Sequence, residues 1–298
     1  MNNDLISVVA IDVGGSSVKS GAVTFDGSVT SLLHTPIDSQ ASKDDVLHQF
    51  VNIIKKHLDK INQDALIGIA FGFPGPFDYM NGVSYIQGQS KYDDLYQVNI
   101  RDELKKRLKF KNDIRFCNDA EAAIVGEANF GAGKGFNRVF GITLGTGLGA
   151  GFVVNGISIH KGTGIPPNAE LFPLTFKGIR ADDLFSTRGL LVRFQNLGHS
   201  YSAVAEATTD IKHGNTVPIQ VFNQFGEDLG RFLRPIAEDF SAEILIVLGG
   251  IAGAFTYFRD PLEDHLDIPV VNGNIQNAAL LGAATLLFKD HYAFLQGN

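Results

Sequence analysis

The stretch Ile142–Phe152, ITLGTGLGAGF, decides between two folds. Its glycines and Ala150 match G-x-G-x-x-G/A, the pattern with which dinucleotide-binding folds hold a pyrophosphate at the start of a helix. Here the chain continues as GFVVNGISI, in which β-branched residues and an Asn-Gly turn favour a β-hairpin. The pattern also wants an acidic residue about 20 positions further on in a following strand, and no such residue is found there. We therefore predict a glycine-rich hairpin whose backbone N–H groups can face an anion.

A second strand–glycine–strand pattern, IDVGGSSVKSGAV, spans Ile11–Val23. Two such hairpins, one in each half of the chain, could hold a triphosphate from opposite sides. Asp12 ends the first strand and could hold Mg²⁺ through water, since Mg²⁺ uses one or two carboxylates together with phosphates. Lys19 could contact phosphate, although a solvated strand lysine is an equal reading. Ser16 and Ser17 could likewise be plain turn residues.

The order strand, glycine loop, strand, turn, strand, helix occurs twice, from about residue 6 and again from about residue 138. Two copies of one unit predict an α/β protein of two lobes around a central cleft, where ligands of open α/β sheets gather. We expect an N-terminal lobe over 1–117, joined by a C-terminal helix over 277–290, and a C-terminal lobe over 118–298. The GAGKG segment at 131–135 is expected to be a flexible joint.

Alternation and helical spacing give the individual elements. Strands are expected at 7–11, 20–25, 28–33, 66–71, 113–116, 138–144, 150–154, 157–160, 244–248 and 268–271. Helices are expected from 42 to about 61, from 119, and over 182–195, 217–239 and 277–288.

Composition narrows the partners of the protein. The 298 residues carry a net charge of −7, which argues against nucleic acid and anionic membranes because both attract clustered Lys and Arg. The single cysteine, Cys117, excludes an internal disulfide and a multi-cysteine zinc site. No apolar run approaches the roughly 20 residues that span a bilayer, and the start MNNDLISVVAID is no signal peptide. We expect a cytoplasmic protein.

The segment Phe116–Glu127, FCNDAEAAIVGE, carries the candidate chemistry. Asn118 and Asp119 stand where a strand ends and a helix begins, a position at which both are ordinary N-caps. Alternatively, Asp119 is a general base that takes a hydroxyl proton during phosphoryl transfer. Because two phosphate-type hairpins accompany it, we favour the base.

Five motifs in order make the sequence similar to the ROK family (repressors, open reading frames, kinases). They are DVGGSSVK, GFPGPFD, NDAEAA, TLGTGLGAG and VLGGIAG, which begin at residues 12, 72, 118, 143 and 247. The chain resembles the bacterial sugar kinases of this family, and the resemblance covers nearly its whole length. It implies a hexokinase–actin–ribonuclease H-like fold, ATP and Mg²⁺ as cofactors, and in-line attack of a sugar hydroxyl, most often O6, on the γ-phosphate. Family members are commonly homodimers.

The resemblance also assigns site residues. For the phosphates of ATP it implies Asp12, Gly14, Gly15, Ser16, Gly145, Thr146 and Gly147, with Lys19 beside them; for the adenosine, Gly249 and Gly250; for the sugar, Gly75, Asn118, Asp119, Glu170 and either Asp182 or Asp183. Asp119 is the catalytic residue in this assignment.

Two departures from the family pattern concern the sugar side. The family's E-x-G-H is Glu170–Pro173, ELFP, so proline replaces a histidine that hydrogen-bonds the sugar. The family's cysteine-rich zinc segment is absent, so no structural zinc is expected. We expect Phe172, Phe176 and Phe185 to order this segment by packing.

Two alternatives remain open at this point. The first is a non-catalytic sugar sensor, suggested by Pro173. A DNA-binding repressor is not expected, because family repressors carry a DNA-binding domain before the first phosphate motif and only a handful of residues precede Ser7. The second alternative is a kinase that uses polyphosphate, for which Lys134, Arg138 and Lys161 could form a basic track.

Overall fold

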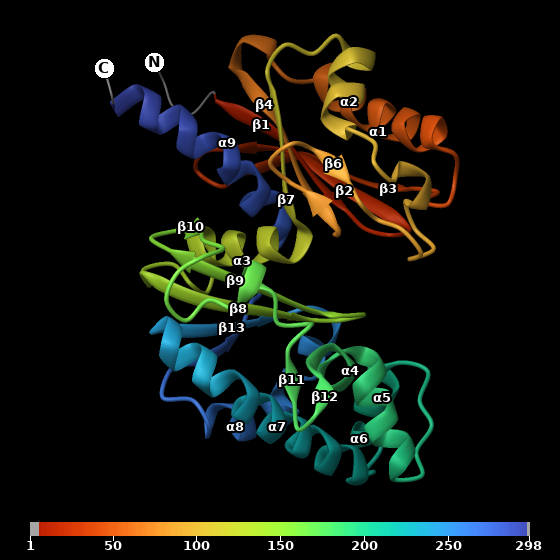
Figure 1. Ribbon diagram of the computed structural model, residues 1–298, viewed down its shortest axis with the longest axis vertical. Helices are drawn as coiled ribbons and strands as arrows, with labels where there is room; N and C mark the ends of the chain where they lie inside the picture. Colours follow the sequence, from red (N-terminus) through yellow and green to blue (C-terminus); the bar gives the residue numbers. More distant parts are fainter. Residues whose placement is uncertain (1–5, 297–298) are drawn as a thin grey trace. The chain divides into compact units, whose positions relative to one another are not determined.

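The computed structural model describes residues 6–296, with side chains to residue 289. The start of the chain, which is not expected to be a signal peptide, lies outside the described residues as far as residue 5. The chain folds as two compact units (Figure 1). The first comprises Met1–Gly126 and Gln276–Asn298, and the second comprises Glu127–Ile275. The division falls inside helix α3 (Asp119–Phe130), whereas the sequence places the lobe boundary after residue 117.

The first unit is built on a five-stranded sheet of order β3-β2-β1-β4-β7. Its strands are β1 (Ser7–Val13), β2 (Ser17–Thr24), β3 (Val29–Pro36), β4 (Leu66–Phe73) and β7 (Asp113–Asn118). The first three form an antiparallel meander, and β4 and β7 add to β1 in parallel. A hairpin suffices for the meander, but parallel neighbours need the crossovers that α1 and α2 supply.

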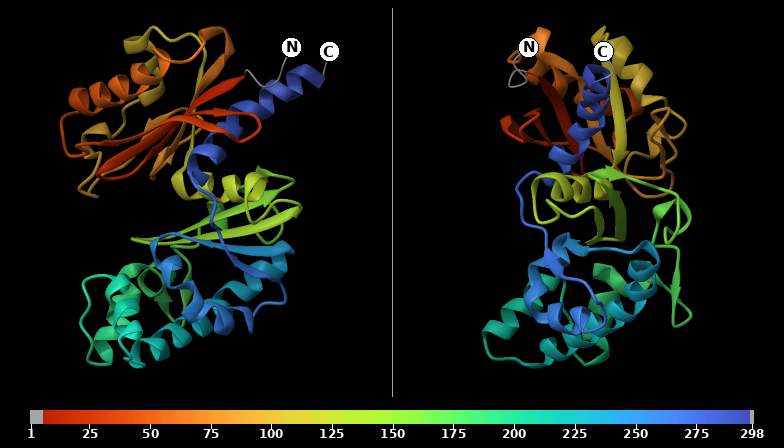
Figure 2. Two further views of the ribbon diagram at one scale, coloured as in Figure 1. Left: turned by 180° about the vertical axis from the view of Figure 1, so that it is seen from behind. Right: turned by 90° about the vertical axis from the view of Figure 1, so that its left-hand side faces the viewer.

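Helices cover both faces of this sheet. On one face, α1 (Lys43–Leu58) buries Val46, Phe50 and Ile54 in a core shared with the odd-numbered positions of β1. On the other, α9 (Ala278–Gln296) packs on β1, β2 and β4 (Figure 2). The helix predicted for 277–288 is thus confirmed.

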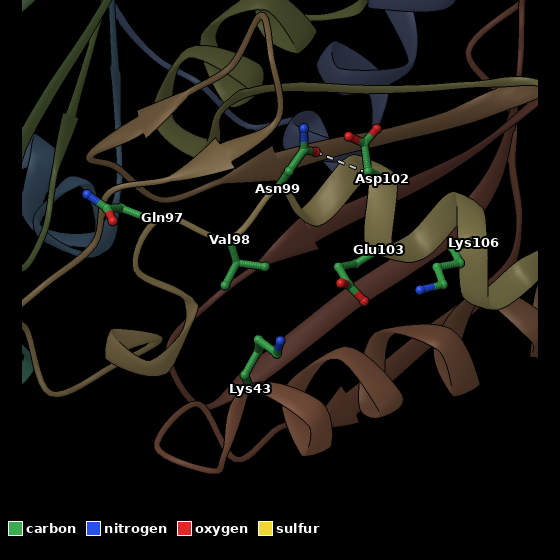
Figure 3. Close-up of a pocket in the computed structure, with 7 residues that line it drawn as sticks. All are labelled: Lys43, Gln97, Val98, Asn99, Asp102, Glu103 and Lys106. Atoms are coloured by element: carbon green, nitrogen blue, oxygen red, sulfur yellow. Dashed lines mark hydrogen bonds between the residues drawn. The ribbon is translucent and has the colours of Figure 1, made fainter.

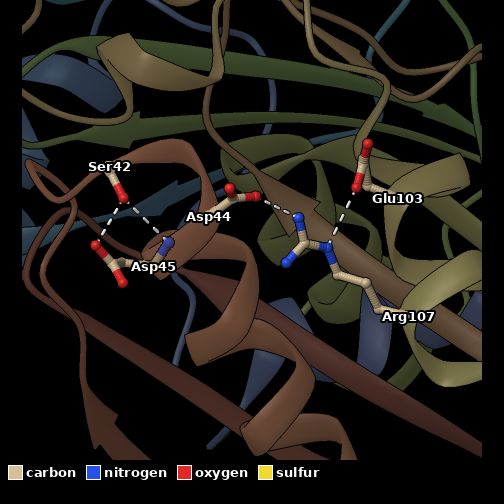
Figure 4. A network of polar contacts seen from close by, with 5 residues as sticks. All are labelled: Ser42, Asp44, Asp45, Glu103 and Arg107. Carbon is tan, nitrogen blue, oxygen red and sulfur yellow. Dashed lines mark hydrogen bonds and ion pairs between the residues drawn. The ribbon is translucent and has the colours of Figure 1, made fainter.

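Ion pairs fasten α1 to α2 (Ile100–Leu108), a helix absent from the sequence prediction. Arg107 contacts Asp44 of α1 at 2.5 Å and Glu103 of its own helix at 3.2 Å (Figure 4). Ser42 caps α1 by accepting the N–H of Asp45. These contacts are exposed, so they fix the position of α2 more than they stabilise the fold.

The second unit repeats the strand order of the first, as β10-β9-β8-β13-β14. Its strands are β8 (Arg138–Leu144), β9 (Leu148–Val154), β10 (Ile157–Ser158), β13 (Ile244–Leu248) and β14 (Val270–Asn272). Here too an antiparallel meander is extended by two parallel strands. Two α/β units with one topology confirm the predicted two-lobed, ribonuclease H-like fold class.

The helices of the second unit bury a phenylalanine-rich core. They are α4 (Ala181–Phe185), α5 (Thr187–Asn196), α6 (Val204–Lys212), α7 (Val217–Phe240) and α8 (Phe255–Glu263). The single helix expected over 182–195 is wrong in one respect, because extended backbone at Ser186 divides it into α4 and α5. Phe222, Phe225 and Phe232 face this core, and α7 and α8 pack along each other.

Short elements complete the two units. They are 3-10 turns η2 (Gln63–Ala65), η3 (Asp93–Leu95), η4 (Pro167–Ala169) and η5 (Gly250–Ala254), and strands β5 (Phe77–Asp78), β6 (Val83–Ser84), β11 (Thr175–Phe176) and β12 (Ile179–Arg180). No helix among residues 6–296 combines the length and apolarity needed to cross a membrane.

The segment 131–135, expected to be a flexible joint, is a turn held by a buried carboxylate. Glu127 is fully buried; one of its oxygens accepts the N–H of Ala132 at 2.9 Å and the other accepts that of Ile275 at 2.9 Å. Gly131 leaves room for this side chain, because a Cβ there would overlap the Glu127 carboxylate. The glycine therefore serves close packing, which corrects the joint interpretation.

The crossing of α3 and α9 within the first unit depends on two glycines. A Cβ on Gly282 would overlap the carbonyl oxygen of Ala122, and one on Gly126 would overlap that of Ala278. Because backbone sits against backbone, neither helix can yield by changing a rotamer.

We expect Gly282→Ala to lower the free energy of unfolding by about 2 kcal/mol or more, through overpacking. Alanine favours helix over glycine by about 1 kcal/mol, so the sign of the change is diagnostic. Gly253→Ala is the control, because nothing lies within 4 Å of a Cβ there. Urea unfolding measures both, and a stabilised Gly282→Ala variant would contradict the close crossing.

Candidate active site

The carboxyl ends of three parallel strands bring the candidate acidic residues of the first unit together. In the sheet register Asp12 of β1 pairs with Gly72 of β4, and Phe73 pairs with Asn118 of β7. Gly72 is buried, and a Cβ on it would lie 3.5 Å from the Cα of Asp119. Asp12 and Asp119 therefore flank the same strand end.

Both carboxylates hold their protons more tightly than in water. Burial raises the pKa of Asp12, the negative charge of Asp119 adds to this rise and the facing Lys19 opposes both effects, with a net pKa of about 6. Burial also raises the pKa of Asp119, against a hydrogen bond from the Ala120 N–H and the positive charge of Lys91. Such a partly desolvated pair is typical of a site that handles protons or a cation.

Asn118 takes the helix-capping role, which leaves Asp119 available. The Asn118 side-chain oxygen accepts the N–H groups of Ala120 and Glu121, at 3.0 and 3.2 Å. Its amide nitrogen donates to the hydroxyl of Tyr79 at 3.1 Å, and that hydroxyl donates to the Phe73 carbonyl. Tyr79, which sequence reasoning missed, thereby fixes the orientation of Asn118.

Gly75 lies next to the same tyrosine, as expected for a residue at this end of the sheet. A Cβ on Gly75 would lie 3.1 Å from the Tyr79 hydroxyl. The side chain of Gln89 donates to the Gly75 carbonyl at 3.4 Å. The Pro-Gly-Pro loop is thus close to Asn118, the other predicted sugar residue of this unit.

The first glycine loop is held in place by hydrogen bonds that its carbonyl groups accept. The Tyr92 hydroxyl donates to the Gly14 carbonyl at 2.6 Å, and the Ser39 hydroxyl donates to the Gly15 carbonyl at 2.5 Å. Among the described residues, the N–H groups of Gly15 and Ser16 donate to no backbone carbonyl. Both residues are exposed, so these donors are available to an anion.

Lys19 stands directly opposite Asp12 on the neighbouring strand. Side chains at such positions point to the same face, with Cβ atoms about 5 Å apart. The lysine is partly buried and lowers the pKa of Asp12. Its partial burial opposite a strand-end carboxylate argues against a fully solvated strand lysine.

The second glycine hairpin, Gly145–Gly147, has a different support. The N–H of Thr187, the first residue of α5, donates to the Gly145 carbonyl at 2.7 Å. Asp182 accepts the N–H of Leu148 at 2.8 Å, and a Cβ on Gly147 would lie 3.1 Å from its carboxylate. Thr146 and Gly147 are exposed at the tip. Asp182, predicted on the sugar side, therefore lies against the phosphate hairpin.

Gly249 and Gly250 follow β13 and are exposed beside the end of β8. Gly249 has φ = 94°, and a Cβ there would overlap the backbone of Leu144, the residue before the second hairpin. Only glycine meets both conditions at low cost. The predicted adenosine loop and the second phosphate hairpin are thus adjacent at one edge of this sheet.

The Glu170 segment is ordered by packing and by an ion triad. Phe185 lies 5.9 Å from Phe176 and 5.2 Å from Phe232, ring centre to ring centre. Phe172 is 39% exposed, so the expectation that it joins this packing is wrong. Glu170 is partly buried and Pro173 is exposed.

Asp228 of α7 completes the order of this region. Its carboxylate oxygens accept hydrogen bonds from the ammonium of Lys177, at the turn between β11 and β12, and from the guanidinium of Arg193 in α5. Each N···O distance is 2.8 Å. Burial of Asp228 opposes its ionisation, but the hydrogen bonds from Lys177 and Arg193 outweigh that effect and lower its pKa. The carboxylate of Asp228 therefore joins the β11–β12 turn, α5 and α7.

Arg138, one of the three basic residues considered for polyphosphate, does not lie at the second hairpin. Arg138 begins β8, whereas the hairpin follows the other end of that strand. Its guanidinium donates to the Phe240 carbonyl at 2.7 Å and lies over the Phe240 ring. Arg138 is thus engaged in the fold at the opposite edge of the sheet.

A divalent cation fits the donors of the first unit. Within the described residues, no three side chains of His, Cys, Asp or Glu gather as a metal cluster. At this strand end, however, the negative charge of Asp119 raises the pKa of Asp12, and a cation would relieve that repulsion. One carboxylate with water and phosphate oxygens is the usual environment of Mg²⁺.

One pocket of the first unit lies elsewhere. It is lined by Lys43, Gln97, Val98, Asn99, Asp102, Glu103 and Lys106, at the starts of α1 and α2 (Figure 3). It contains none of the predicted site residues. The structure thus groups the predicted residues at the strand ends of each unit: the acidic and Pro-Gly-Pro residues in the first, and the second hairpin with the Gly249 loop in the second.

Two α/β units of one topology, each with a glycine hairpin after the first strand of its sheet, define the actin- and hexokinase-like fold class. The chain belongs to the ROK family, whose sequence profile matches residues 8–289. It is 31% identical to a glucokinase of Halalkalibacterium halodurans, over 97% of each chain.

Solved structures agree with the fold. A ROK hexokinase from Thermus thermophilus superposes with a TM-score of 0.80 at 20% identity, over 97% of this chain and 100% of that one. A ROK glucokinase from Streptomyces griseus, solved with glucose and AMPPNP, gives a TM-score of 0.73 at 20% identity, over 95% of this chain and 99% of that one.

The raised pKa of Asp12 predicts a pH-dependent stability. Its folded pKa of about 6 lies above the unfolded value, so the folded state takes up a proton first as the pH falls. Stability is therefore lost as the pH rises from the unfolded pKa to about 6, and the full cost of the ionised Asp12 is present above that pH. We expect Asp12→Asn to raise the free energy of unfolding at pH 8 by about 1–3 kcal/mol over that of the wild type. At pH 5 this difference between variant and wild type should be smaller by about 1 kcal/mol.

Urea unfolding of both proteins at the two pH values measures this difference. Asp94→Asn, at an exposed position of the same unit, is the matched control. A gain at Asp12 that is equal at pH 8 and pH 5 would contradict the burial of an ionisable carboxyl there.

Proposed function

We propose that this chain, a sugar kinase of the ROK family, transfers the γ-phosphate of ATP to a hydroxyl, O6, of a hexose or hexose derivative. The observation that carries the proposal is Asp119, a partly buried carboxylate of raised pKa beside a glycine loop with free N–H donors. The names of the relatives support the reaction, since one is a glucokinase and another was solved with glucose and AMPPNP.

In this mechanism Asp119 accepts the proton of the attacking hydroxyl as the bond to the γ-phosphorus forms. A general base with a pKa nearer neutrality than that of a free carboxyl suits this task. The N–H groups of Gly15 and Ser16 and the ammonium of Lys19 bind phosphate oxygens, and Gly145–Gly147 binds them from the second unit. Asp12 would hold Mg²⁺ through water, and the bound ion supplies charge neutralisation.

The sugar is bound, in this proposal, by Asn118 and Glu170, with Gly75 giving close approach. Because Tyr79 and the helix N–H groups occupy most of the Asn118 amide, one of its N–H bonds is left for a hydroxyl. Pro173 offers no hydrogen bond where relatives have histidine. A site without that donor discriminates less between sugars that differ at the corresponding hydroxyl.

We expect Asp119→Asn to lower kcat about 10²- to 10⁴-fold, because the amide cannot accept the hydroxyl proton. The affinity for ATP should change by less than about threefold, since that interaction is made by other groups. A coupled assay for ADP and calorimetry measure the two quantities. Asp64→Asn, at an exposed turn, is the control. Near-full activity of the Asp119 variant would rule out the base.

A substrate panel tests the function itself. Hexoses, N-acetylhexosamines and fructose are each assayed with ATP and with polyphosphate. We expect turnover with ATP on at least one glucose-like hexose, and little with polyphosphate, because Arg138 lies at the wrong end of β8 for a donor track. No turnover in any combination would favour the sugar-sensor alternative.

The family resemblance adds a quaternary state to the proposal, a homodimer. Sedimentation equilibrium tests it directly, and a monomer at micromolar concentration would remove that part alone.

A further inference from the structure

Lys91 lies against the first glycine loop, although neither composition nor motif marks it. A Cβ on Gly15 would be 3.6 Å from the Cδ atom of Lys91, so the aliphatic part of the side chain passes over the loop. Lys91 is partly buried, whereas Gln87–Ser90 before it are exposed. The side chain therefore turns back onto the protein instead of extending into water.

The positive charge of Lys91 acts on the candidate base. The positive charge of Lys91 lowers the pKa of Asp119, which places the two groups within electrostatic range. The two do not form an ion pair within 4 Å, and among the described residues Lys91 has no other acidic partner. A partly buried lysine that packs on a phosphate loop, forms no ion pair and acts electrostatically on a nearby carboxylate is suited to bind an anion.

The backbone around Lys91 is fixed by contacts to Ser39 and Gln40, and Ser39 in turn donates to the Gly15 carbonyl. Ser90 and Tyr92 both have φ = 56°, the left-handed region that non-glycine residues avoid. The side chain of Gln40 donates to the Ser90 carbonyl at 3.0 Å, and the Tyr92 N–H donates to the Ser39 carbonyl at 2.6 Å. Strained backbone that is held by several contacts is typical of functional positions.

Tyr92, which follows Lys91 in the chain, connects this segment directly to the glycine loop. Its ring is 1% exposed and packs 5.5 Å from Phe73, and its hydroxyl donates to the Gly14 carbonyl. Tyr92, the residue next to Lys91, thus holds the loop, so the backbone position from which the Lys91 side chain starts is fixed relative to the loop. Preset charges cost no reorganisation during reaction.

We propose that Lys91 is a catalytic residue of this kinase, whose ammonium contacts the phosphoryl group in transit and stabilises its negative charge. This assignment rests on the proposed function. The phosphoryl group must move from donor phosphates on the Gly14–Ser16 loop to a hydroxyl beside Asp119. Lys91 packs on the loop and its charge acts on Asp119, whereas Lys19 faces Asp12 on the neighbouring strand.

The bonds in this step balance without a further reactant. The sugar oxygen forms its bond to the γ-phosphorus, and the bond from that phosphorus to the β,γ-bridging oxygen breaks. The electron pair remains on ADP, and the hydroxyl proton passes to Asp119. Lys91 keeps its protons and acts by charge, which matters most where negative charge is spread over the three equatorial oxygens.

The test is Lys91→Met, which keeps the length of the side chain and removes the charge. We expect kcat to fall about 10²- to 10³-fold, with the KM values for ATP and sugar changed less than about tenfold, since the interaction strengthens in the transition state. Lys111→Met, at an exposed position, is the matched control. Thermal unfolding of each variant confirms an intact fold.

Chemical rescue separates charge from structure. The chain has one natural cysteine, Cys117, which is buried. Lys91→Cys can therefore be alkylated selectively with 2-bromoethylamine, which restores an ammonium at nearly the original length. We expect the unmodified variant to be impaired like Lys91→Met and the alkylated protein to regain kcat, whereas alkylation with iodoacetamide should restore nothing.

The outcomes distinguish this inference from the proposed function. A wild-type protein that phosphorylates no sugar overturns the proposed function, and the role of Lys91 with it. If the wild type is active and Lys91→Met keeps kcat within about threefold, the role of Lys91 is overturned and the kinase stands. A rise in KM for ATP at unchanged kcat also overturns it, because that result describes ground-state binding.

Discussion

The parallel pairing of β1, β4 and β7 is the constraint on which the first unit's site depends. This register places Asp12 next to Gly72, and Phe73 next to Asn118, so carboxylates distant in the sequence flank one strand end. A slip of one residue would turn every side chain to the other face of the sheet. The absence of a side chain at Gly72 matters equally, since a Cβ there would lie 3.3 Å from the Cβ of Ala122 at the start of α3.

The two glycine hairpins resemble each other in sequence but are supported by different chemistry. In the first, neutral hydroxyls of Tyr92 and Ser39 hold the loop carbonyls. In the second, the carboxylate of Asp182 holds a loop N–H and is itself paired with Arg188 at 3.3 Å. The first loop therefore keeps the N–H groups of Gly15 and Ser16 as donors, and it has Lys91 packed against it. Duplication preserved the strand order, while the supports that surround each loop diverged.

Local signals predicted the fold well and the supporting residues poorly. Alternation, the Asn-Gly turn after the second glycine loop and the glycine loops themselves identified strands of both meanders, because those signals act over a few residues. The break at Ser186 was missed, since it arises when Thr187 donates to Gly145, a residue remote in the sequence. Lys91 and Tyr92 were missed for the same reason: only the folded chain brings them to Gly14 and Gly15.

The segment that follows Glu170 is ordered by ion pairs, whereas the family pattern has a cysteine-rich zinc segment here. With one cysteine in the chain, a cysteine-rich zinc site cannot hold the segment after Glu170. Instead Asp228 joins the β11–β12 turn to α5 and α7 through two cations. Loss of either cation would leave a carboxylate that is 9% exposed without full compensation, which is costly. The order of this segment is thus coupled to the ionisation of Asp228, and not to the supply of a metal.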